Sequence, residues 1–230
     1  MKAIIINASP RKNGNTAALL DKVCDGLEAS GCETKTVSLA TLKFRGCISC
    51  LACKVKGNKC DGLCALRDDL RPVLEETFVS DILILGSPVY FHYPVAAARA
   101  FTERLLFAPL EYTNPSVPHL KKKIHCACLY TMHMPSDKLF AEYAYEQTLG
   151  MAAKSFEFIG SSEVLYFRGL TVFKPHDRYE ISPELIKMFD DIKSRNYADY
   201  EAACVDLGKR LADKAAMTIG ERRYKWQRSC

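Results

Sequence analysis

Short β-rich runs alternate with helical patterns along most of the chain, and this order constrains the fold more than any other feature. The strands that we expect cover 2–7, 33–39, 81–86, 123–130 and a stretch within 163–173. Continuous apolar runs occupy three of them, as in parallel strands that are buried on both faces. Helical patterns fill the intervals at 16–30, 68–78, 95–106, 137–159 and from 182 onward. The alternation predicts an α/β fold with helices on both faces of a parallel sheet.

Length and composition predict one domain over 1–230. A chain of 230 residues, 48% of them hydrophobic, can bury roughly 70–75% of its unfolded surface, and its composition is close to the globular average. No change in composition marks a linker between two domains. We expect a cysteine-rich insertion at 46–66 and a helical C-terminal extension from about 182.

Charge and hydropathy exclude two kinds of partner. The net charge of +5 is mild for this length and forms no basic stripe, so we expect no nucleic-acid binding. No apolar stretch reaches the roughly 18 residues of a membrane helix, so we expect no membrane contact. The apolar run at 3–6 is too short for a signal peptide, which predicts a cytoplasmic protein.

A polar loop at 7–16 follows the first expected strand and leads directly into a helix. Backbone N–H groups and the helix dipole make such a position a natural anion site. Ser9, Asn15 and Thr16 add side-chain donors, and Arg11 adds a charge that suits a phosphate monoester. Neither the dinucleotide motif G-x-G-x-x-G nor the triphosphate motif G-x-x-x-x-G-K-[ST] occurs here. The loop therefore predicts a monophosphate site, with a simple helix-capping connection as the alternative.

A second loop, Gly-Ser-Pro-Val-Tyr-Phe-His-Tyr-Pro at 86–94, follows the third expected strand. In a doubly wound sheet of order 2-1-3-4-5, ligands bind where the strand order reverses, between the first and third strands. Pro88, Val89, Tyr90 and Phe91 offer an aromatic surface and backbone amides to a planar ring. Such a cluster alone is more often part of a core. Its pairing with the anion loop favours a ligand that joins a phosphate to a ring.

Three segments together, at 9–16, 86–91 and 99–104 (Arg-Ala-Phe-Thr-Glu-Arg), resemble the NADPH-dependent FMN reductase and iron-sulfur flavoprotein branch of the flavodoxin-like superfamily. The resemblance covers about 1–134 well and the rest loosely. It implies a flavodoxin-like, doubly wound sheet of five parallel strands in the order 2-1-3-4-5. It also implies a homodimer or homotetramer, because in many relatives a neighbouring subunit closes over the flavin.

The resemblance assigns a cofactor and its contacts. It implies FMN with its phosphate on Ser9, Arg11, Asn15 and Thr16, and its ring against Pro88, Val89, Tyr90 and Phe91. A third loop of the family touches the ring after the fourth strand, and Thr131 and Met132 occupy that place here.

The implied function is an FMN-dependent oxidoreductase that passes electrons from NAD(P)H, a transient donor, through FMN to an acceptor. The acceptor would be a quinone, a nitro or azo compound, free flavin or an iron-sulfur partner. Since the flavin supplies the chemistry, we expect binding residues and no catalytic side chain. Two alternatives are an electron-transfer protein with FMN and a [4Fe–4S] cluster but no small-molecule substrate, and a zinc-stabilised binding module with an empty fold.

Five of the eleven cysteines have the spacing C-x2-C-x2-C-x6-C-x3-C, at Cys47, Cys50, Cys53, Cys60 and Cys64. In a reducing compartment, clustered thiols hold metal more often than they form disulfides. Three close cysteines and a fourth further on can ligate a [4Fe–4S] cluster, and the resembling iron-sulfur flavoproteins carry a compact run of this kind.

The fourth ligand stays open between two candidates. Spacing from Cys53 favours Cys60, whereas a position just ahead of Asp68 and Asp69 favours Cys64. Zinc on two of the first three cysteines with Cys60 and Cys64, thiols without metal, and a structural disulfide are the alternatives.

Overall fold

The computed structural model describes residues 1–57, 60–112, 120, 122–173 and 175–228, with only the backbone of 221–228. Its strands are β1 (Lys2–Asn7), β2 (Glu33–Ser38), β3 (Ile82–Tyr90), β4 (Tyr93–Pro94), β5 (Ile124–Thr131) and β6 (Gly160–Phe167). Its α-helices are α1 (Asn15–Ala29), α2 (Leu70–Val79), α3 (Ala96–Phe107), α4 (Asp137–Glu142), α5 (Tyr145–Lys154) and α6 (Pro183–Arg228).

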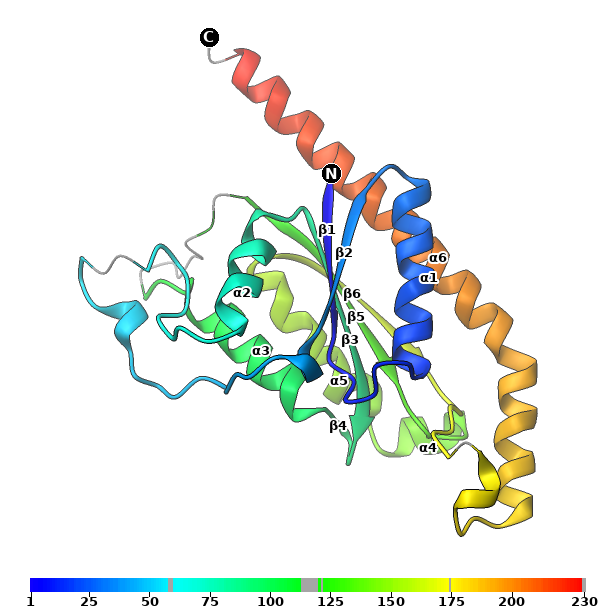
Figure 1. The fold of residues 1–230 in the computed structure, drawn as a ribbon. Coiled ribbons are helices and arrows are strands. Elements are labelled where there is room, and N and C mark those ends of the chain that lie inside the picture. Colours follow the sequence, from blue (N-terminus) through cyan, green and yellow to red (C-terminus); the bar gives the residue numbers. More distant parts are fainter. Residues whose placement is uncertain (58–59, 113–119, 121, 174, 229–230) are drawn as a thin grey trace.

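One sheet organises the chain, with the strand order β2-β1-β3-β5-β6 and parallel pairing throughout this path. This is the predicted order 2-1-3-4-5, so the fold class is confirmed. The two-residue strand β4 adds an antiparallel pairing to the end of β3. The register aligns Asn7 with Gly86 and Pro88 with Thr131. The carboxyl ends of β1, β3 and β5 therefore meet at one edge of the sheet (Figure 1).

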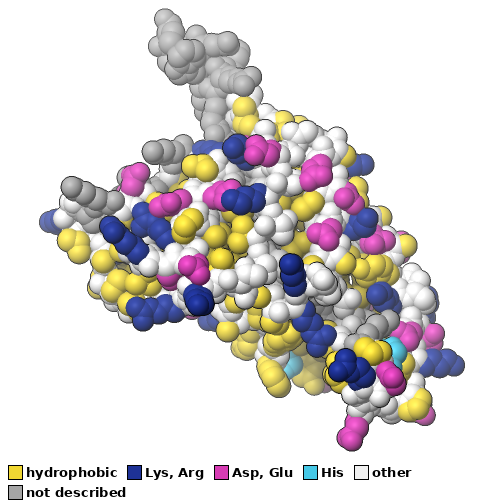
Figure 2. All heavy atoms as spheres, viewed as in Figure 1, with side chains coloured by type: hydrophobic (Ala, Val, Ile, Leu, Met, Phe, Trp, Pro, Cys, Tyr) yellow, Lys and Arg dark blue, Asp and Glu magenta, His cyan; other side chains and the backbone are white. Residues whose placement is uncertain are grey.

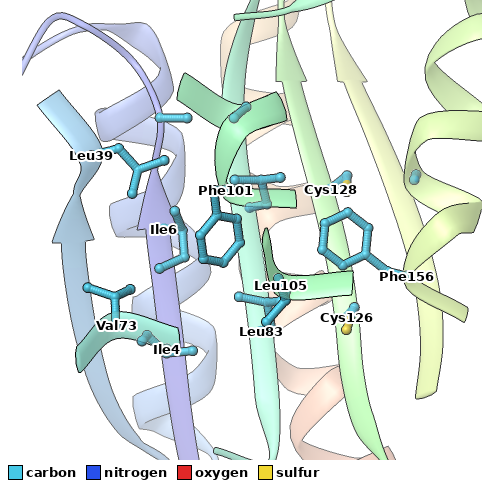
Figure 3. Packing of buried hydrophobic residues seen from close by; sticks show 14 of the residues in the cluster. Ile4, Ile6, Leu39, Val73, Leu83, Phe101, Leu105, Cys126, Cys128 and Phe156 are labelled. Atoms are coloured by element: carbon cyan, nitrogen blue, oxygen red, sulfur yellow. The ribbon is translucent and has the colours of Figure 1, made fainter. Parts of the chain in front are cut away.

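Alternating side chains of the strands build one core on each face of the sheet. On one face, Ile4, Ile6 and Leu83 pack with α2, α3 and α5 (Figure 3). On the other face, Ile5 and Ile84 pack with α1 and α6. Continuous apolar runs in the central strands thus serve two cores at once, which explains why these strands read as uninterrupted hydrophobic stretches.

Helix α6 crosses α1 at very close range, with the two helices side by side in Figure 1. A Cβ atom on Gly26 would lie 2.1 Å from the carbonyl oxygen of Val205, and one on Gly208 would lie 2.5 Å from that of Val23. Only glycine permits this approach of two backbones. The two glycines thereby fix where α6 lies along the sheet.

Two local expectations were wrong. The third strand does not end at Gly86 but continues to Tyr90, because β4 turns back and pairs with it. The helix expected over 137–159 is broken at Ala144, whose φ of 50° is left-handed, and it becomes α4, α5 and a 3₁₀ turn. A helix does begin at Pro183. The division into one domain with an insertion and an extension stays a prediction.

The surface carries charges of both signs. In Figure 2, Lys and Arg side chains lie interspersed with Asp and Glu over the visible face. Among the residues that the structure describes, no helix combines the length and the apolar character needed to cross a bilayer.

Candidate functional site

A cavity of about 1240 Å³ lies at the carboxyl ends of the parallel strands. All ten side chains that were predicted to hold the cofactor line it: Ser9, Arg11, Asn15, Thr16, Pro88, Val89, Tyr90, Phe91, Thr131 and Met132. They come from three loops that are far apart in the sequence and that the parallel register brings together. That these side chains bind a cofactor stays a prediction.

Local hydrogen bonds shape the first loop, between β1 and α1. The side chain of Asn7 accepts from the backbone N–H of Ser9 at 3.0 Å, and the Ser9 hydroxyl accepts from that of Arg11 at 3.2 Å. Both Asn7 and Ser9 are buried. These short bonds hold the loop open in front of α1, as Asx and Ser turns do.

The N-terminus of α1 faces this loop without a capping side chain. Gly14 is the N-cap, and in α1, every residue of which is described, no side chain caps the first turn and no acidic residue lies in it. Helix α4 differs, because the Ser136 hydroxyl accepts from the N–H of Leu139. The first N–H groups of α1 are therefore available to an anion.

Buried polar side chains tie the first loop to its neighbours. The Thr16 and Thr131 hydroxyls lie 2.7 Å apart, and both residues are buried. Asn15 donates to the carbonyl of Thr171 at 3.0 Å, and Arg11 donates to that of Val172 at 2.7 Å. These bonds fasten the first loop to the segments that follow β5 and β6.

The charged residues at the cavity favour an anion. Among the described lining residues, the cations are Arg11, Lys12 and Lys193, and the acid is Asp21. The excess of positive charge suits a phosphate group.

The segment from Pro88 to Phe91 forms the opposite end of the cavity and then turns sharply. Tyr90 pairs with Tyr93, leaving a two-residue hairpin turn at Phe91 and His92. Both have positive φ, 47° and 74°, the pattern of a type I′ turn that normally takes Asn or Gly. Phe91 is 94% exposed, so it lies at the rim and does not form a wall.

One wall of the cavity was missed by the sequence analysis. It consists of 170–173 after β6, Lys193 and Tyr197 of α6, and His133 after β5. The Lys193 ammonium lies 4.6 Å from the centre of the Tyr197 ring. The His133 ring lies 3.6 Å from that of Phe189, and desolvation lowers the pKa of this imidazole. No sequence motif marks Lys193 and Tyr197, because the packing of α6 on α1 brings them here.

The cysteine loop forms a second, smaller pocket against α3. Four cysteines line it, namely Cys47, Cys50, Cys53 and Cys64, together with Arg104. Cys60 is not among the lining residues, and its sulfur lies 4.0 Å from the carbonyl oxygen of Ala52. The structure thus gathers four of the five cysteines that were predicted as metal ligands and leaves Cys60 outside.

Two side chains fasten this loop to α3. The ammonium of Lys54 donates to the carbonyls of Phe107, Ala108 and Leu110 at the end of the helix. From within α3, Glu103 accepts from the backbone N–H of Cys47 at 3.2 Å.

Between these anchors the loop backbone is strained. Ser49 and Leu51 have positive φ, 52° and 56°. Such backbone strain is common at functional loops.

The cysteines are not arranged as a preformed metal site in the part of the chain that the structure describes. In the described part of the chain, no three His, Cys, Asp or Glu side chains come close enough to hold one metal ion. A cubane spreads its four thiolate ligands further apart than one ion does. The pocket encloses only about 10 Å³, and Cys47 and Cys50 are exposed. The loop would therefore open outward to accept a cluster.

Comparisons with known proteins agree with this arrangement. An iron-sulfur flavoprotein of Archaeoglobus fulgidus is 38% identical over 106 residues, which cover 46% of this chain and 46% of the relative. The chain thus matches less than half of the length of that relative.

Two solved structures share the fold. A NAD(P)H:quinone oxidoreductase of Methanothermobacter marburgensis superposes with a TM-score of 0.66 at 13% identity, over 92% of this chain and 98% of that one. An FMN-dependent NADH-azoreductase of Bacillus anthracis in complex with FMN has a TM-score of 0.58 at 15% identity, over 90% of this chain and 99% of that one.

The sequence pattern of the NADPH-dependent FMN reductases matches residues 1–133. That match covers more than half of the chain and includes all three loops at the carboxyl ends of β1, β3 and β5. This chain therefore belongs to the NADPH-dependent FMN reductase family, a family of flavoprotein oxidoreductases.

Proposed function

We propose that this protein binds FMN in the cavity at the carboxyl ends of β1, β3 and β5 and passes electrons from NAD(P)H to an acceptor. One observation carries the proposal. Side chains from three distant loops, all named from sequence as FMN contacts, line a single cavity with a polar, cationic end and an apolar end. The membership of the chain in the FMN reductase family supports the same cofactor.

The polar end would hold the phosphate. The uncapped first turn of α1 offers backbone N–H groups, and Ser9, Asn15 and Thr16 offer side-chain donors. Arg11 is exposed, and its guanidinium donates to the carbonyl of Val172 in the segment after β6, so it can turn toward a dianion and bind it with two N–H groups.

The apolar end would hold the ring. Val89 and Tyr90 would present backbone and side-chain surface to the flavin ring. Thr131 and Met132, which line the same cavity, would contact the ring from the loop after β5. Bound FMN would supply the redox chemistry between the nicotinamide and the acceptor. The residues of the chain bind and orient, and none is required to move a proton.

We also propose that Cys47, Cys50, Cys53 and Cys64 bind a [4Fe–4S] cluster. They line one pocket, and relatives of the chain are named iron-sulfur flavoproteins. Burial raises the pKa of the Cys53 thiol, and Lys54 opposes this shift. An anionic thiolate is therefore favoured only when a metal neutralises it.

Two classes of acceptor follow from the two pockets. A quinone, nitro, azo or flavin compound would enter the open end of the FMN cavity beside Tyr90. Alternatively, the cysteine pocket favours an electron-transfer role, with electrons leaving through the cluster to a partner protein. Quinone and azo compounds appear in the names of two proteins that share this fold.

A homodimer or homotetramer fits the exposed hairpin at the mouth of the cavity. Phe91 is 94% exposed, Tyr93 is 52% exposed, and Tyr143 of the neighbouring segment is 50% exposed. A second subunit that covered these rings would remove apolar surface from water and complete the rim of the site.

An absorption spectrum of anaerobically purified protein, followed during addition of NADH or NADPH, tests the function. We expect flavin absorption that bleaches with one nucleotide and returns when a quinone is added. Steady-state rates should follow ping-pong kinetics, because the nicotinamide leaves before the acceptor binds. Protein that contains FMN but never bleaches with either nucleotide would contradict the reductase and leave the electron-transfer role.

A further inference from the structure

Helix α6 contributes a lysine to the wall of the large cavity from outside the part of the chain that matches the family pattern. Lys193 and, one turn later, Tyr197 line the same cavity as the loop at 7–16. Both residues come after 1–133, the region that the pattern covers. Any role of these two side chains therefore belongs to the C-terminal helix of this chain and not to the three loops of the family.

Contacts on both sides fix the place of Lys193. One residue earlier, Ile192 packs on Gly169 so closely that a Cβ atom on this glycine would lie 2.2 Å from the isoleucine side chain. One turn later, Tyr197 lies within electrostatic range of Lys22 of α1. Toward the carboxyl ends of the strands, α6 and α1 diverge in Figure 1, and residues of both helices line the cavity there. Lys193 therefore lies between the first turns of α1 and the segment after Gly169.

The segment after Gly169 is bonded to the polar end of the cavity. The carbonyl of Thr171 accepts from Asn15 at 3.0 Å, and that of Val172 accepts from Arg11 at 2.7 Å. Asn15 and Arg11 are two of the proposed phosphate ligands. The cations Arg11 and Lys193 therefore reach the same end of the cavity from two elements that are far apart in the sequence.

The Lys193 ammonium has no counter-charge in the described part of the chain. It forms no ion pair there, and it lies over the face of the Tyr197 ring, 4.6 Å from the ring centre. Lys22 on the facing helix differs, because Asp25 pairs with it at 3.0 Å. An aromatic face attracts a cation but does not neutralise its charge. A half-buried, unneutralised ammonium on the wall of a cavity favours an anion inside it.

We propose that Lys193 binds the phosphate group of FMN together with Arg11, so that α6 forms part of the cofactor site. This inference rests on the proposed FMN cavity. A phosphate monoester carries close to two negative charges at neutral pH, which is more than Arg11 alone offsets. The ammonium of a lysine is a compact charge with three donors on a flexible stem, so it can turn from the Tyr197 ring to a phosphate oxygen.

Two other roles for Lys193 compete with this one. The 2′-phosphate of NADPH is a second phosphate monoester that could use the same cation. FMN is favoured because the segment beside Lys193 is bonded to Arg11 and Asn15. The other competing role is structural, with the Lys193 and Tyr197 pair stabilising α6 only. A structural pair would not distinguish a ligand with a phosphate from the same ligand without one.

Substitution of Lys193 by glutamine gives the sharpest test. Lys193→Gln removes the charge, and Lys187→Gln makes the same change at an exposed position of the same helix that does not line the cavity. Full-length apoprotein is titrated with FMN and with riboflavin by fluorescence quenching. We expect Lys193→Gln to bind FMN about tenfold more weakly and riboflavin as wild type does. Lys187→Gln should match wild type for both ligands, and Lys193→Arg should retain most of the affinity for FMN.

Each outcome decides the question. Wild-type FMN affinity in Lys193→Gln overturns the inference and leaves the proposed FMN cavity standing. An equal loss for FMN and riboflavin also overturns it, because the substitution would then act on the wall and not on the phosphate. Unchanged FMN affinity with a raised KM for NADPH, but not for NADH, assigns Lys193 to the nicotinamide donor instead. Wild-type protein that binds neither flavin overturns the proposed function together with this inference.

A second measurement needs no variant. Wild-type apoprotein is treated with acetic anhydride, and the acetylated lysines are mapped by peptide mass spectrometry. Saturating FMN should slow the acetylation of Lys193 and leave that of Lys187 unchanged, whereas riboflavin should protect neither. Equal protection of Lys193 by FMN and riboflavin, or protection by neither, would contradict a contact between Lys193 and the phosphate.

Discussion

Loops at the carboxyl ends of the sheet strands carry the residues of the proposed FMN cavity, whereas an insertion packed on α3 carries the cysteines at 47–64. Thr16 and Thr131 are buried and bonded to each other at the ends of adjacent elements. Cys47 and Cys50, by contrast, are exposed at the edge of a small pocket. We propose that the first site is formed without its ligand and that the second is completed by its ligand. We therefore expect variants to separate the two sites cleanly.

The largest difference between the two sites should come from substitutions of Cys60 and Cys64, the two candidate fourth ligands. Cys64→Ser removes a thiol from the pocket, so reconstituted protein should lose its iron, with an affinity loss beyond the roughly 10–100-fold typical of outer-shell changes. Cys60→Ser should retain wild-type iron, because Cys60 does not line the pocket. Iron and acid-labile sulfide analysis measures both. Loss of iron in Cys60→Ser with retention in Cys64→Ser would reverse the assignment.

Breaking the ion pair behind the cysteine loop should have the next largest effect. Asp68→Asn leaves the enclosed Arg104 without a counter-charge, and this should lower the free energy of unfolding by about 3–5 kcal/mol. Asp25→Asn is the matched control, since its pair with Lys22 is exposed and contributes little to stability. Urea denaturation compares them. Equal midpoints would show that the Arg104 pair contributes no more than a surface pair.

Gly26→Ala tests the placement of the wall that α6 provides. The new Cβ would lie 2.1 Å from a backbone carbonyl of α6, so the helices must separate at a cost of about 2–3 kcal/mol. We expect weaker FMN binding and unchanged iron binding. In Gly220→Ala the new Cβ meets no atom within 4 Å, so this control should behave as wild type. Wild-type stability of Gly26→Ala would contradict the close crossing.

Thr16→Val should weaken FMN binding and leave the cysteine loop intact. The change removes a hydroxyl that the proposed site offers to the phosphate, and the loss of one such hydrogen bond corresponds to about tenfold in Kd. Thr102→Val, whose hydroxyl bonds to a carbonyl of its own helix, is the control. Fluorescence titration of FMN measures both, and equal affinities would exclude Thr16 from the site.

The smallest effect should lie at the opposite edge of the sheet, away from both sites. Burial raises the pKa of Asp81, but hydrogen bonds from Lys122 and from the backbone N–H of Lys2 outweigh it and hold the pKa below its ordinary value. Because its pKa is lowered in the folded protein, ionised Asp81 stabilises the fold above about pH 5. This stabilisation is lost as the pH falls through the pKa of the folded state.

Asp81→Asn should therefore reduce, by about 1 kcal/mol, the unfolding free energy that is lost between neutral and acid pH. It should change neither the FMN content nor the iron content. Thermal melts between about pH 3 and pH 7 measure this pH dependence of stability. If wild type and variant lose the same stability at acid pH, the acid sensitivity belongs to other carboxylates, such as Asp68.

The same contrast explains what the sequence could predict. Ser9 to Thr16 were identifiable because polar donors directly follow a buried strand, and parallel strands carry such loops to one edge. Lys193 and Tyr197 were not identifiable, because their place depends on a helix crossing between Gly26 and Gly208, which are remote in sequence. The hairpin at Phe91 and His92 lacks the usual Asn-Gly signal.

The choice between Cys60 and Cys64 shows the limit of spacing as an argument. Both satisfy part of the pattern, and the proposal of Cys64 rests on the packing of the loop on α3. Arg104 was visible within the family-like segment 99–104 but carried no signal of its burial or of its neighbours. Where the sheet sets the geometry, residue order is informative. In an insertion, tertiary contacts decide.

The proposed function depends most on a cavity that recognises a ring joined to a phosphate. Titration of apoprotein with FMN and with riboflavin, which lacks the phosphate, tests this directly by fluorescence quenching. We predict that FMN binds at least about 100-fold more tightly, since several charge-assisted hydrogen bonds are lost with the phosphate. Equal affinities for the two, or no binding of either, would contradict the assignment of the loop at 7–16 and of the cavity.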